Sequence, residues 1–532
     1  MIRTTMVQTV YIQHFQHGRY SFTSTTSPIS EIHTKPITKK WLNGDTIDEN
    51  TNNVLQRNSS SHKSLVGIVD FVNRIRVGMT PRGVPLYNFH PYDVAYPVMH
   101  VASKLTPSDN QIALVSFEHW DLKTPRAGIQ HIYGPVGDIT VEIAALRMGV
   151  NIPRAVFDQE ESLVPSNRLH DPRPWDIVFN IDPEGCEDVD DVMGWRQTNG
   201  ELEFFIGIVD IAAWISEGST LDEEAKRAAQ TLYIDGVAVE PMFPEIISAQ
   251  KASLRTDGIK RPVLALVYTF SNESTPQPQW RLLNVAVSNA YTYDSVLQNE
   301  TIVKTLPQVL ATITNQHESS SDPHIWVEQA MIAYNTEAGK LLKDRGVGLL
   351  RKHEGTSNAT YQALAEQTGI KELAFLGSAA GTYTQATDHN PHHAGLNLNA
   401  YCHASSPLRR YADVVNHRWI RHIVFGTQKP QNPTNPEPLN HRATLIKHFE
   451  RTSWFLKNIK QYGITITRGI ILTYDKDAGE GKVYVPSWKR TIRAGKVTQT
   501  NHKPGDEVKV RAFTNIRATT LNKRIVCAME PL

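Results

Sequence analysis

Hydrophobic and polar positions change their spacing along the chain, and this change separates β-rich segments from a mixed centre. Between residues 65 and 120, short runs such as LVGIVDFV and IALVSFEHW lie between turns at Gly, Pro and Asn. Runs that alternate apolar and polar positions are typical of half-buried strands, and several short strands in succession predict a small barrel. The next segment, GDITVEIAALRMG at 137–149, has apolar positions at helical spacing and predicts a short helix.

The first 64 residues allow two interpretations. Residues 7–15 (VQTVYIQHF) alternate, and residues 41–48 (WLNGDTID) have the pattern of a closing strand. Together they favour a first small β-domain that ends in a linker at 59–64. The first thirty residues also contain Arg3 and Arg19 and no acidic residue, which is faintly similar to an organellar transit peptide. We predict the β-domain, and the targeting segment stays the alternative.

The centre of the chain, about residues 171–463, mixes two patterns. Apolar runs such as FFIGIVDIAAWI and RPVLALVYTF resemble buried strands, whereas HIWVEQAMIAYNTEAGKLLKDRG has the spacing of a long helix. Strands and helices in one segment predict an α+β domain. We therefore predict a first β-domain at 1–64, a second barrel at 65–156, an α+β domain at 157–463 and a C-terminal barrel at 464–532.

Length and composition favour a soluble protein of several domains. The 532 residues exceed one hydrophobic core, since single cores stop growing near roughly 250 to 300 residues. No apolar run approaches the ~20 residues that span a bilayer, so we expect no membrane association. The cysteines Cys186, Cys402 and Cys527 form no CxxC pair, which argues against a disulfide framework and a thiolate zinc site. We expect an intracellular protein, cytoplasmic in the first instance, with the nucleus and organelles as alternatives.

Positive charge gathers near the C-terminus, although the formal net charge of the whole chain is only +1. Residues 464–532 contain 13 Lys and Arg against 6 Asp and Glu, in strand-like runs that also carry Tyr474, Tyr484, Trp488 and Phe513. Cations hold phosphates and aromatic faces stack bases, so this barrel suits a single-stranded nucleic acid. The alternative for each aromatic residue is a place in the core of the barrel.

The stretch NIDPEGCEDVDD, residues 180–191, places four aspartates and two glutamates after a strand-like run. Carboxylates this close repel one another, and a hard divalent cation with oxygen ligands removes the repulsion. An EF-hand is excluded because, counted from Asp182, the sixth position is Glu187 instead of Gly and the twelfth is Met193 instead of Glu. The stretch favours a metal site over the remaining alternative, a solvated acidic turn.

A second cluster supplies positive charge. The segment HASSPLRRYADVVNHRWIRH, residues 403–422, starts with a turn of small residues and continues as a helix that gathers arginines. Guanidinium groups match the geometry of phosphate oxygens. A carboxylate metal loop and an arginine-rich helix start are the two parts of a phosphodiester-cleaving site, because metals activate water while arginines hold the non-bridging oxygens.

The two clusters belong to a longer resemblance. IDPEGCEDVDD resembles the acidic signature of the ribonuclease II family, the RNB-type exoribonucleases that include the catalytic subunit of the exosome. Six further blocks follow in order, namely YIDGVAVEPMFPE, SLRTDGIKRPVLAL, VEQAMIAYN, LLRKHEG, HASSPLRRYADVVNHR and LNHRATLIKHFER. The resemblance implies an α+β RNB-type catalytic domain flanked by small OB-fold β-barrels, cold-shock-like before it and RNA-binding after it. We expect no endonuclease domain of the kind that exosome subunits carry.

The resemblance also implies roles for residues at the matching positions. The metal ligands would be Asp182, Asp188, Asp190 and Asp191, and the catalytic residues would be Asp190, Arg409, Arg410 and Glu450. The RNA contacts would be Tyr233, His403, Ser406, Arg409, Arg410 and Arg418. The chain departs from the family where many members have a His-x-Ala-Asp-Val-Ser run. Residues 207–213 read GIVDIAA, which keeps Asp210 and loses the His and the Ser.

The function that this resemblance implies is metal-dependent hydrolysis of single-stranded RNA from the 3′ end to 5′-mononucleotides, with Mg²⁺ or Mn²⁺ as cofactor. One alternative is a catalytically weak or inactive RNA-binding protein on the same scaffold, and another is a nuclease directed at DNA. The complete aspartate quartet favours an active enzyme. We expect a monomeric catalytic chain, to which protein partners of an RNA-decay complex can be added.

Overall fold

The computed structural model describes residues 7–532 apart from 17–18, 25–31, 35–39, 43–44, 49–50, 52, 58–63, 74–76, 94–95, 151–172, 199, 235–236, 271–275, 317, 356–358, 377–380, 432–434, 462 and 497–501. The predicted linker at 59–64, except residue 64, and the predicted boundary at 156/157 lie outside the described residues. Residues 1–6, where the segment compared with a transit peptide begins, lie outside them too.

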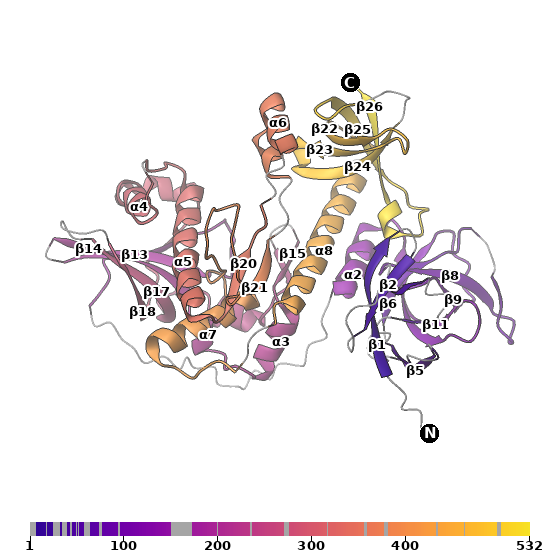
Figure 1. Cartoon of the computed structure of the whole chain (residues 1–532), viewed down its shortest axis with the longest axis horizontal. Helices are drawn as coiled ribbons and strands as arrows, with labels where there is room; N and C mark the ends of the chain where they lie inside the picture. Colours follow the sequence, from indigo (N-terminus) through magenta and orange to yellow (C-terminus); the bar gives the residue numbers. More distant parts are fainter. Residues whose placement is uncertain are drawn as a thin grey trace. The chain divides into compact units, whose positions relative to one another are not determined.

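The chain divides into two compact units, which we describe one at a time (Figure 1). The first unit comprises Met1–Asn151 and His448–Leu532, and the second comprises Ile152–Lys447. The division falls within helix α8 (Glu437–Gln461). The domain boundary that we expected at 463/464 therefore stays a prediction.

Residues 7–56 of the first unit contribute a five-stranded antiparallel sheet. Its strands pair in the order β3-β2-β1-β4-β5, with bounds Val7–Gln16 for β1, Arg19–Ser24 for β2, Ile32–Thr34 for β3, Thr46–Asp48 for β4 and Val54–Gln56 for β5. The closing strand that we expected at 41–48 is confined to β4, which pairs with β1. Trp41 and Leu42, just before it, are fully buried.

A closed barrel follows in the first unit. It is built from β6 (Leu65–Val69), β7 (Gly78–Met79), β8 (Pro85–Pro91), β9 (Met99–Ala102), β10 (Gln111–His119) and β11 (Arg126–Pro135). Because β6 pairs with both β10 and β8, the strands β6, β10, β11, β9 and β8 close a ring, and β7 adds to β8. Gly67 permits this closure, since a Cβ there would lie 2.2 Å from the carbonyl oxygen of His90.

The helix expected at 137–149 is confirmed as α2 (Ile139–Val150). Its residue Ala145 shares a buried apolar cluster with Ile68 and Ile112, so α2 packs against β6 and β10. None of the described helices is long and apolar enough to cross a membrane.

The C-terminal barrel is closed by five strands in the order β22-β23-β24-β26-β25. Their bounds are Thr465–Asp475 for β22, Glu480–Val485 for β23, Arg490–Lys496 for β24, Glu507–Thr514 for β25 and Ile525–Pro531 for β26, with short 3-10 turns η5 (Pro486–Trp488) and η6 (Leu521–Lys523). Phe455 and Ile459 of α8 complete the core of this barrel. The barrel predicted from the tail is therefore confirmed as an element of the fold.

The aromatic residues of this barrel do not all face solvent. Tyr484 is only 2% exposed, whereas Phe513 is 38% exposed. Tyr474 and Trp488 are partly buried and pack against the core. For Tyr484 the alternative, a place in the core of the barrel, is confirmed. Apolar and polar positions stop alternating at the end of β23, where the last three residues are all buried.

The second unit is built on a six-stranded sheet in the order β18-β17-β14-β13-β12-β19. Its strands are β12 (Ile177–Ile181), β13 (Asp191–Thr198), β14 (Glu201–Val209), β17 (Arg261–Phe270), β18 (Pro278–Val285) and β19 (Asn289–Tyr291). All neighbours are antiparallel except β12 and β19, which are parallel. The strand expected at 204–215 ends at Val209, and residues after Asp210 form a 3-10 turn, η1 (Ile211–Ala213).

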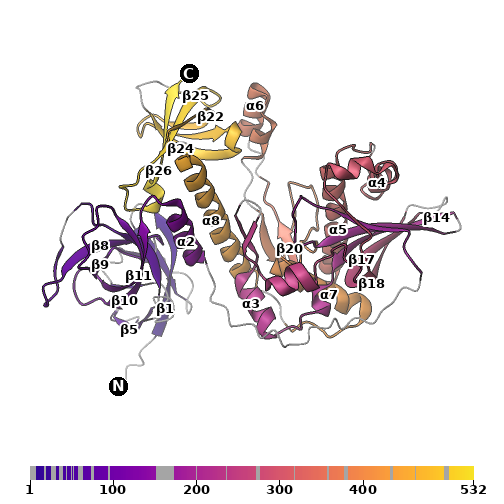
Figure 2. The same ribbon diagram turned by 180° about the vertical axis from the view of Figure 1, so that it is seen from behind.

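Helices and two small hairpins complete the second unit. The helices are α3 (Thr220–Ala228), α4 (Glu300–Ile313), α5 (Pro323–Arg345), α6 (Ala359–Thr368) and α7 (Tyr411–Phe425), with shorter turns η2 (Ile246–Lys251), η3 (Ser295–Gln298) and η4 (Lys371–Phe375). The hairpins pair β15 (Leu232–Ile234) with β16 (Val237–Glu240) and β20 (Leu349–Lys352) with β21 (Thr382–Gln385). Figures 1 and 2 show α5 beside the sheet, and the Tyr334 hydroxyl of α5 donates to the Leu264 carbonyl of β17.

The long helix expected at 324–346 is confirmed as α5. The Asp322 side chain accepts a hydrogen bond from the His324 backbone N–H, Pro323 takes the first turn, and Gly346 ends the helix with φ +63°. Gly339 on α5 lets the backbone of residue 401 approach closely, since a Cβ there would lie 2.9 Å from the Tyr401 Cα. The segment that leads into the arginine cluster therefore packs directly on α5.

Candidate active site

The acidic stretch forms the loop between β12 and β13, and backbone hydrogen bonds fix it at several points. The Asp182 N–H donates to the Tyr291 carbonyl (3.0 Å), and the Val209 N–H donates to the Asp190 carbonyl (2.8 Å). Within the loop, the Cys186 N–H donates to the Pro183 carbonyl, and Gly185 takes φ +78° as that turn requires. The aspartates therefore sit on a fixed loop.

Two polar residues outside the loop also hold it. The Ser253 hydroxyl accepts the Val189 N–H (3.0 Å) and donates to the Glu187 carbonyl (2.7 Å). The Asn180 side chain donates to the Leu254 carbonyl (2.9 Å). We assigned no role to Ser253 or Asn180 from the sequence, although Ser253 opens one of the blocks that carried the family resemblance. For Ser253 that position was the only signal, and Asn180 had none, because a supporting hydrogen bond leaves no pattern in a single sequence.

Burial dominates the electrostatics of the loop. Desolvation raises the pKa of Asp182 to about 6, against the opposing charge of Arg409. Desolvation raises the pKa of Asp190 to about 7, against the opposing effects of Arg409 and of the Leu408 N–H. Burial and the neighbouring aspartates raise the pKa of Asp191 well above its usual value. These carboxylates therefore hold protons more tightly than exposed ones unless a positive partner arrives.

Arg409 is the positive group nearest to Asp190. The Leu408 backbone N–H donates to Oδ1 of Asp190 (2.9 Å), and Arg409 Nε donates to Oδ2 (3.1 Å). Asp190 is 4% exposed in its side chain and Arg409 is 45% exposed. The guanidinium thus neutralises Asp190 on one side, while much of the Arg409 side chain remains open to solvent. The structure thus brings the acidic loop and the arginine cluster together, as the sequence predicts.

Arg410 is held by a different carboxylate. Its guanidinium donates to both oxygens of Asp413 (2.8 and 3.0 Å), and the Ser406 N–H donates to Asp413 Oδ1 (2.8 Å). Asp413 is completely buried, whereas the Arg410 side chain is 22% exposed. Asp413 therefore fixes both the turn before α7 and the direction of Arg410. It lay in the quoted motif, but we gave it no role from the sequence.

His403 and Ser406 lie on the same turn but offer little to a ligand. His403 Nδ1 lies 2.9 Å from the Tyr383 hydroxyl, and desolvation lowers the pKa of His403 well below its usual value. The imidazole is therefore neutral at pH 7. Ser406 is 4% exposed, and its backbone carbonyl accepts the Arg410 N–H (3.0 Å). Their assignment as RNA contacts stays a prediction.

Two buried asparagines hold the segment that precedes this turn. Asn335 on α5 accepts the Ala404 N–H (2.8 Å) and donates to the Ser405 hydroxyl (3.1 Å). Asn416 on α7 pairs with both backbone groups of Leu349 on β20 (2.8 and 2.9 Å). These amides fix the arginine turn between α5 and β20. Sequence reasoning missed both, since a buried Asn on a helix resembles a solvent-exposed one in a single sequence.

Tyr233 on β15 reaches the acidic loop. Its hydroxyl donates to Asp188 Oδ2 at 2.5 Å, and desolvation, followed by this hydrogen bond, raises the pKa of Tyr233. The strand is also tied to the arginine turn, because the Thr231 N–H donates to the Arg409 carbonyl (3.0 Å). The structure therefore places Tyr233 with the aspartates, as expected. Whether its ring contacts RNA stays a prediction.

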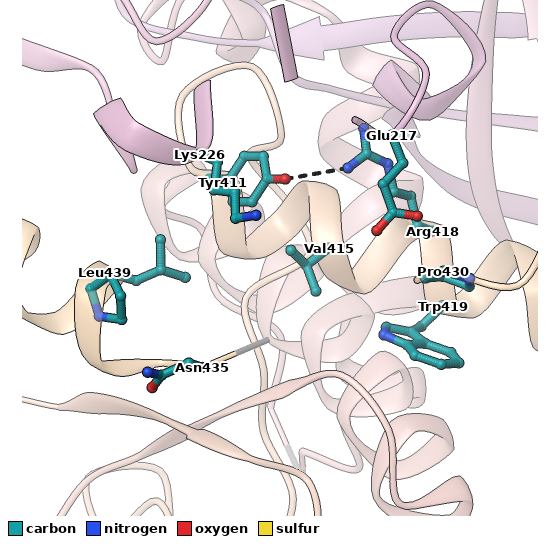
Figure 3. Close-up of a pocket in the computed structure, with 10 residues that line it drawn as sticks. Glu217, Lys226, Tyr411, Val415, Arg418, Trp419, Pro430, Asn435 and Leu439 are labelled. Carbon is teal, nitrogen blue, oxygen red and sulfur yellow. Dashed lines mark hydrogen bonds between the residues drawn. The ribbon is translucent and has the colours of Figure 1, made fainter. Parts of the chain in front are cut away.

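Arg418 lies on α7 among buried partners. It pairs with Asp222 (2.8 Å) and donates to the Ile215 carbonyl (3.2 Å), and its side chain is 9% exposed. Figure 3 shows it beside the Tyr411 hydroxyl, at the wall of a cavity of about 220 Å³ between α7 and the segment around Asn435. This placement favours a structural role, and the RNA contact assigned to Arg418 stays a prediction.

Asp210 and Glu450 are the remaining residues that the sequence analysis singled out. Asp210, in the segment that departs from the family, is completely buried and paired with Arg421 (3.0 Å). The changed segment thus keeps a structural ion pair. Glu450 lies in the part of α8 that belongs to the first unit, so the structure gives it no position relative to the aspartates.

The loop carries the oxygen ligands of a cation site, but its carboxylates do not converge on one point. Its donors are carboxylate oxygens, the ligands that Mg²⁺ and Mn²⁺ prefer. Asp182 Oδ2 and Asp191 Oδ2 are buried with no hydrogen-bond partner, and buried polar atoms without partners call for an explanation. Within the described parts of the chain, however, no three His, Cys, Asp or Glu side chains converge as a ready-made metal cluster. Asp188 and Asp190 are engaged by Tyr233 and Arg409 instead.

Comparison with known proteins agrees with this picture. The family model described as the RNB domain matches residues 175–301 and 294–426. Exoribonuclease 2 of Escherichia coli O1:K1 / APEC is 28% identical over 349 residues, which cover 51% of this chain and 53% of that protein. The chain thus spans about half the length of the curated relatives it matches.

Solved structures extend the likeness to almost the whole chain. Mycoplasma genitalium RNase R in complex with ribose methylated single-stranded RNA has a TM-score of 0.71 at 16% identity, covering 99% of this chain and all of that one. Yeast Ssd1, described as a pseudonuclease, has a TM-score of 0.63 at 14% identity, covering 96% of this chain and 81% of that one. At these identities the likeness shows the fold, which an enzyme and a pseudonuclease share.

Proposed function

We propose, from the premise that this chain belongs to the RNB family through residues 175–426, that it is a metal-dependent hydrolytic 3′-5′ exoribonuclease. It degrades single-stranded RNA to 5′-mononucleotides. One observation carries the proposal: a complete quartet of aspartates, two with buried and unpaired oxygens, lies against an arginine that is still open to solvent. A solvated acidic turn would have neither burial nor a cationic partner.

The residues divide the chemistry between them. Asp182, Asp188, Asp190 and Asp191 would hold the divalent cations, Mg²⁺ or Mn²⁺, which supply activation of a water molecule and charge stabilisation for the departing 3′ oxygen. Arg409 and Arg410 would bind the non-bridging oxygens of the scissile phosphate. The burial of the loop excludes bulk water and strengthens each of these charge interactions. Tyr233 would pack against the terminal nucleotides.

Arg409 and Arg410 offer different kinds of phosphate contact. Both oxygens of Asp413 bind Arg410, so its guanidinium is fixed before any substrate arrives. Arg409 uses only Nε to bind Asp190 and has its two terminal nitrogens left for a phosphate. Arg410, whose guanidinium is already fixed, would position the phosphate. Arg409 would then donate further hydrogen bonds to it from its terminal nitrogens. We keep Glu450 as a further proposed catalytic residue on the family resemblance alone.

The C-terminal barrel would bind the RNA upstream of the site. On its surface Lys482 of β23 stands directly opposite Arg493 of β24, and Arg468 of β22 opposite Lys509 of β25. These cations on neighbouring strands form a basic surface that would attract the phosphates of a polyanion. We also propose single-stranded RNA as the main partner, a monomeric catalytic chain and a cytoplasmic location.

An inactive RNA-binding protein is the second candidate, because the pseudonuclease Ssd1 has the same fold and residues 207–213 depart from the family. The intact quartet and the retained Asp210–Arg421 pair count against it.

One nuclease assay tests the proposal. An oligoribonucleotide labelled at the 5′ end should shorten progressively, and the same RNA labelled at the 3′ end should release labelled 5′-mononucleotide at once. A chelator should stop both, and DNA of the same sequence should be cut more slowly. Early internal fragments, nucleoside 3′-phosphate products or unimpaired activity with chelator would contradict the proposal.

A further inference from the structure

We propose that the hydroxyl group of Tyr233 is a positioning group for the cation site, because it holds Asp188 in place. This inference rests on the proposed function. The contact is the hydrogen bond from the Tyr233 hydroxyl to Asp188 Oδ2 at 2.5 Å. A role in stacking nucleotides needs the ring of Tyr233 and makes no use of its hydroxyl. The hydroxyl therefore has a separate task.

The orientation of the Asp188 carboxylate depends mainly on this one hydrogen bond, whereas the Asp190 carboxylate is oriented by two hydrogen bonds. Two groups donate hydrogen bonds to the Asp190 carboxylate: the Leu408 N–H binds Oδ1 and Arg409 Nε binds Oδ2. Among the described contacts of the Asp188 side chain, the other partner is the Cys186 thiol, 3.8 Å from Oδ1. A thiol is a weak donor. The phenol thus supplies the strong, charge-assisted bond that gives this carboxylate one orientation.

The hydroxyl itself is held at a fixed place. Two backbone hydrogen bonds join the residues just before β15 to the arginine turn: the Thr231 N–H donates to the Arg409 carbonyl (3.0 Å), and the Tyr411 N–H donates to the Ala229 carbonyl (2.8 Å). Together they form the isolated β-bridge between Gln230 and Arg410. Ala229 takes φ +61° to make this connection, a conformation that is costly for a residue with a Cβ.

One framework therefore sets two of the four aspartates. The arginine turn fixes Asp190 directly, and the strand tied to that turn fixes Asp188 through Tyr233. Hydrogen bonds from a second layer of residues orient metal-ligating carboxylates in proteins, and removal of such a bond typically weakens metal affinity by about 10 to 100 times. With Oδ2 of Asp188 engaged by the phenol, Oδ1 is the oxygen left for a cation.

The experiment separates hydroxyl from ring. Mn²⁺ alone is titrated calorimetrically into the RNA-free full-length parent, Tyr233→Phe, Tyr233→Ala and the matched control Tyr334→Phe. The control loses a tyrosine hydroxyl that donates to the Leu264 backbone carbonyl and to no aspartate of the quartet. We expect Tyr233→Phe to bind Mn²⁺ about 10 to 100 times more weakly than the parent, and Tyr334→Phe to bind it as the parent does. The length of the final undigested RNA should be unchanged in Tyr233→Phe and altered in Tyr233→Ala.

The outcomes distinguish this inference from the proposed function. Equal Mn²⁺ affinity in the parent and Tyr233→Phe, or equal loss in Tyr334→Phe, would overturn the positioning role even if the parent is a nuclease. A parent that binds no Mn²⁺ would overturn it as well. A parent that binds Mn²⁺ and loses affinity in Tyr233→Phe, yet cuts no RNA, would support the positioning role and reject the exoribonuclease proposal.

Discussion

Two arginine–carboxylate pairs, one in each unit, put the same chemistry in opposite surroundings. In the first unit, Arg524 Nη2 lies 2.5 Å from Glu142 Oε1, and the two side chains are 0% and 1% exposed, respectively. In the second unit, Arg409 lies 3.1 Å from Asp190, but 45% of its side chain is exposed. The first pair is sealed within protein, and the second is open on the side of the arginine.

The sealed pair has additional partners and a mechanical role. Glu142 on α2 also accepts hydrogen bonds from the Tyr92 hydroxyl (3.1 Å) and the Gly137 N–H (2.9 Å). Arg524 belongs to the C-terminal barrel, just before β26, so the pair joins that barrel to the helix of the preceding one. A buried ion pair of this kind holds α2 and the C-terminal barrel in one arrangement. If the two side chains separated, each would be a buried charge without a partner, which is costly.

The open pair has the opposite property. Solvent reaches Arg409, so the guanidinium can turn to another oxyanion without being left as a buried, unpaired charge. The carboxylate left behind is buried and needs a new cation. An arriving phosphate and an arriving divalent cation would satisfy both partners at once. The difference in exposure between these two arginine–carboxylate pairs thus distinguishes a structural link from a site that can bind a ligand.

The largest expected effect comes from removing the carboxylate of the open pair. Asp190→Asn should lower the rate of RNA hydrolysis by orders of magnitude, since an amide is a poor ligand for a hard cation. The fold should persist, because Asn retains the size of the side chain and the oxygen that accepts the Leu408 N–H. RNA affinity should persist too. The control is Glu184→Gln, an exposed residue of the same loop. Turnover and RNA affinity are measured on each variant, and near-parental turnover of Asp190→Asn would end the metal-site proposal.

Breaking the sealed pair should cost stability and spare chemistry. Arg524→Met leaves Glu142 charged and buried, and the loss of one partner of a buried pair typically costs about 3–5 kcal/mol in the free energy of unfolding. The double variant Glu142→Leu/Arg524→Met should recover most of that loss, because no charge remains uncompensated. Arg468→Gln is the control, since its exposed pair with Glu507 contributes at most about 1 kcal/mol.

Denaturant unfolding of the first unit measures these differences, and turnover of the folded fraction measures the chemistry. If Arg524→Met unfolds like the parent, the pair is not a structural link. If the double variant is as unstable as the single one, packing and not charge explains the loss.

The open pair should also make the second unit sensitive to pH. Burial raises the pKa of Asp182 to about 6 and of Asp190 to about 7. Between about pH 4 and pH 7 the folded state therefore holds protons that the unfolded state has released, so the cation-free protein loses stability as pH rises through this window. A cation must displace those protons, and its affinity should rise over the same window.

Thermal unfolding with and without Mn²⁺ at pH 6 and pH 8 tests the sign of this effect. The stabilisation by Mn²⁺ should be larger at pH 8, and Asp190→Asn should reduce the difference between the two pH values. Stabilisation that is equal at both, or larger at pH 6, would contradict the linkage.

Most of the fold and the central residues of the site could be predicted from the sequence. Alternating and helical patterns predicted the two closed barrels, α2 and α5, because these elements depend on local periodicity. The acidic loop and the arginine turn were predictable because their residue types are crowded in sequence. Ser253, Asn335 and Asn416 were not predicted as supporting residues, since each acts through a backbone group far along the chain. Asp413 was not predicted either, although its partners Ser406 and Arg410 are close in sequence, because its burial is not visible in the sequence. Exposure was equally hidden, so the sequence left open whether Tyr484 lies at the surface or in the core, and Arg418 was given an RNA contact that its burial disfavours.

The smallest expected effect concerns the surface charges of the C-terminal barrel. Deletion of residues 464–532 would also remove Arg524 from Glu142, so it would confuse binding with stability. Neutralising the exposed cross-strand pair avoids this: Lys482→Gln/Arg493→Gln leaves the sealed pair intact. Each cation that no longer neutralises a phosphate should make the slope of log affinity against log salt shallower by about 0.7 for single strands.

The matched control for this variant is Lys503→Gln, an exposed cation of the same barrel that lies outside its strands. RNA affinity is measured at several salt concentrations, alongside unfolding in denaturant. We expect weaker binding with a shallower salt slope in the double variant, and a free energy of unfolding within about 1 kcal/mol of the parent, because exposed charges contribute little to stability. An unchanged slope would mean that RNA does not reach this face, and the barrel would then be a structural partner of Glu142 alone.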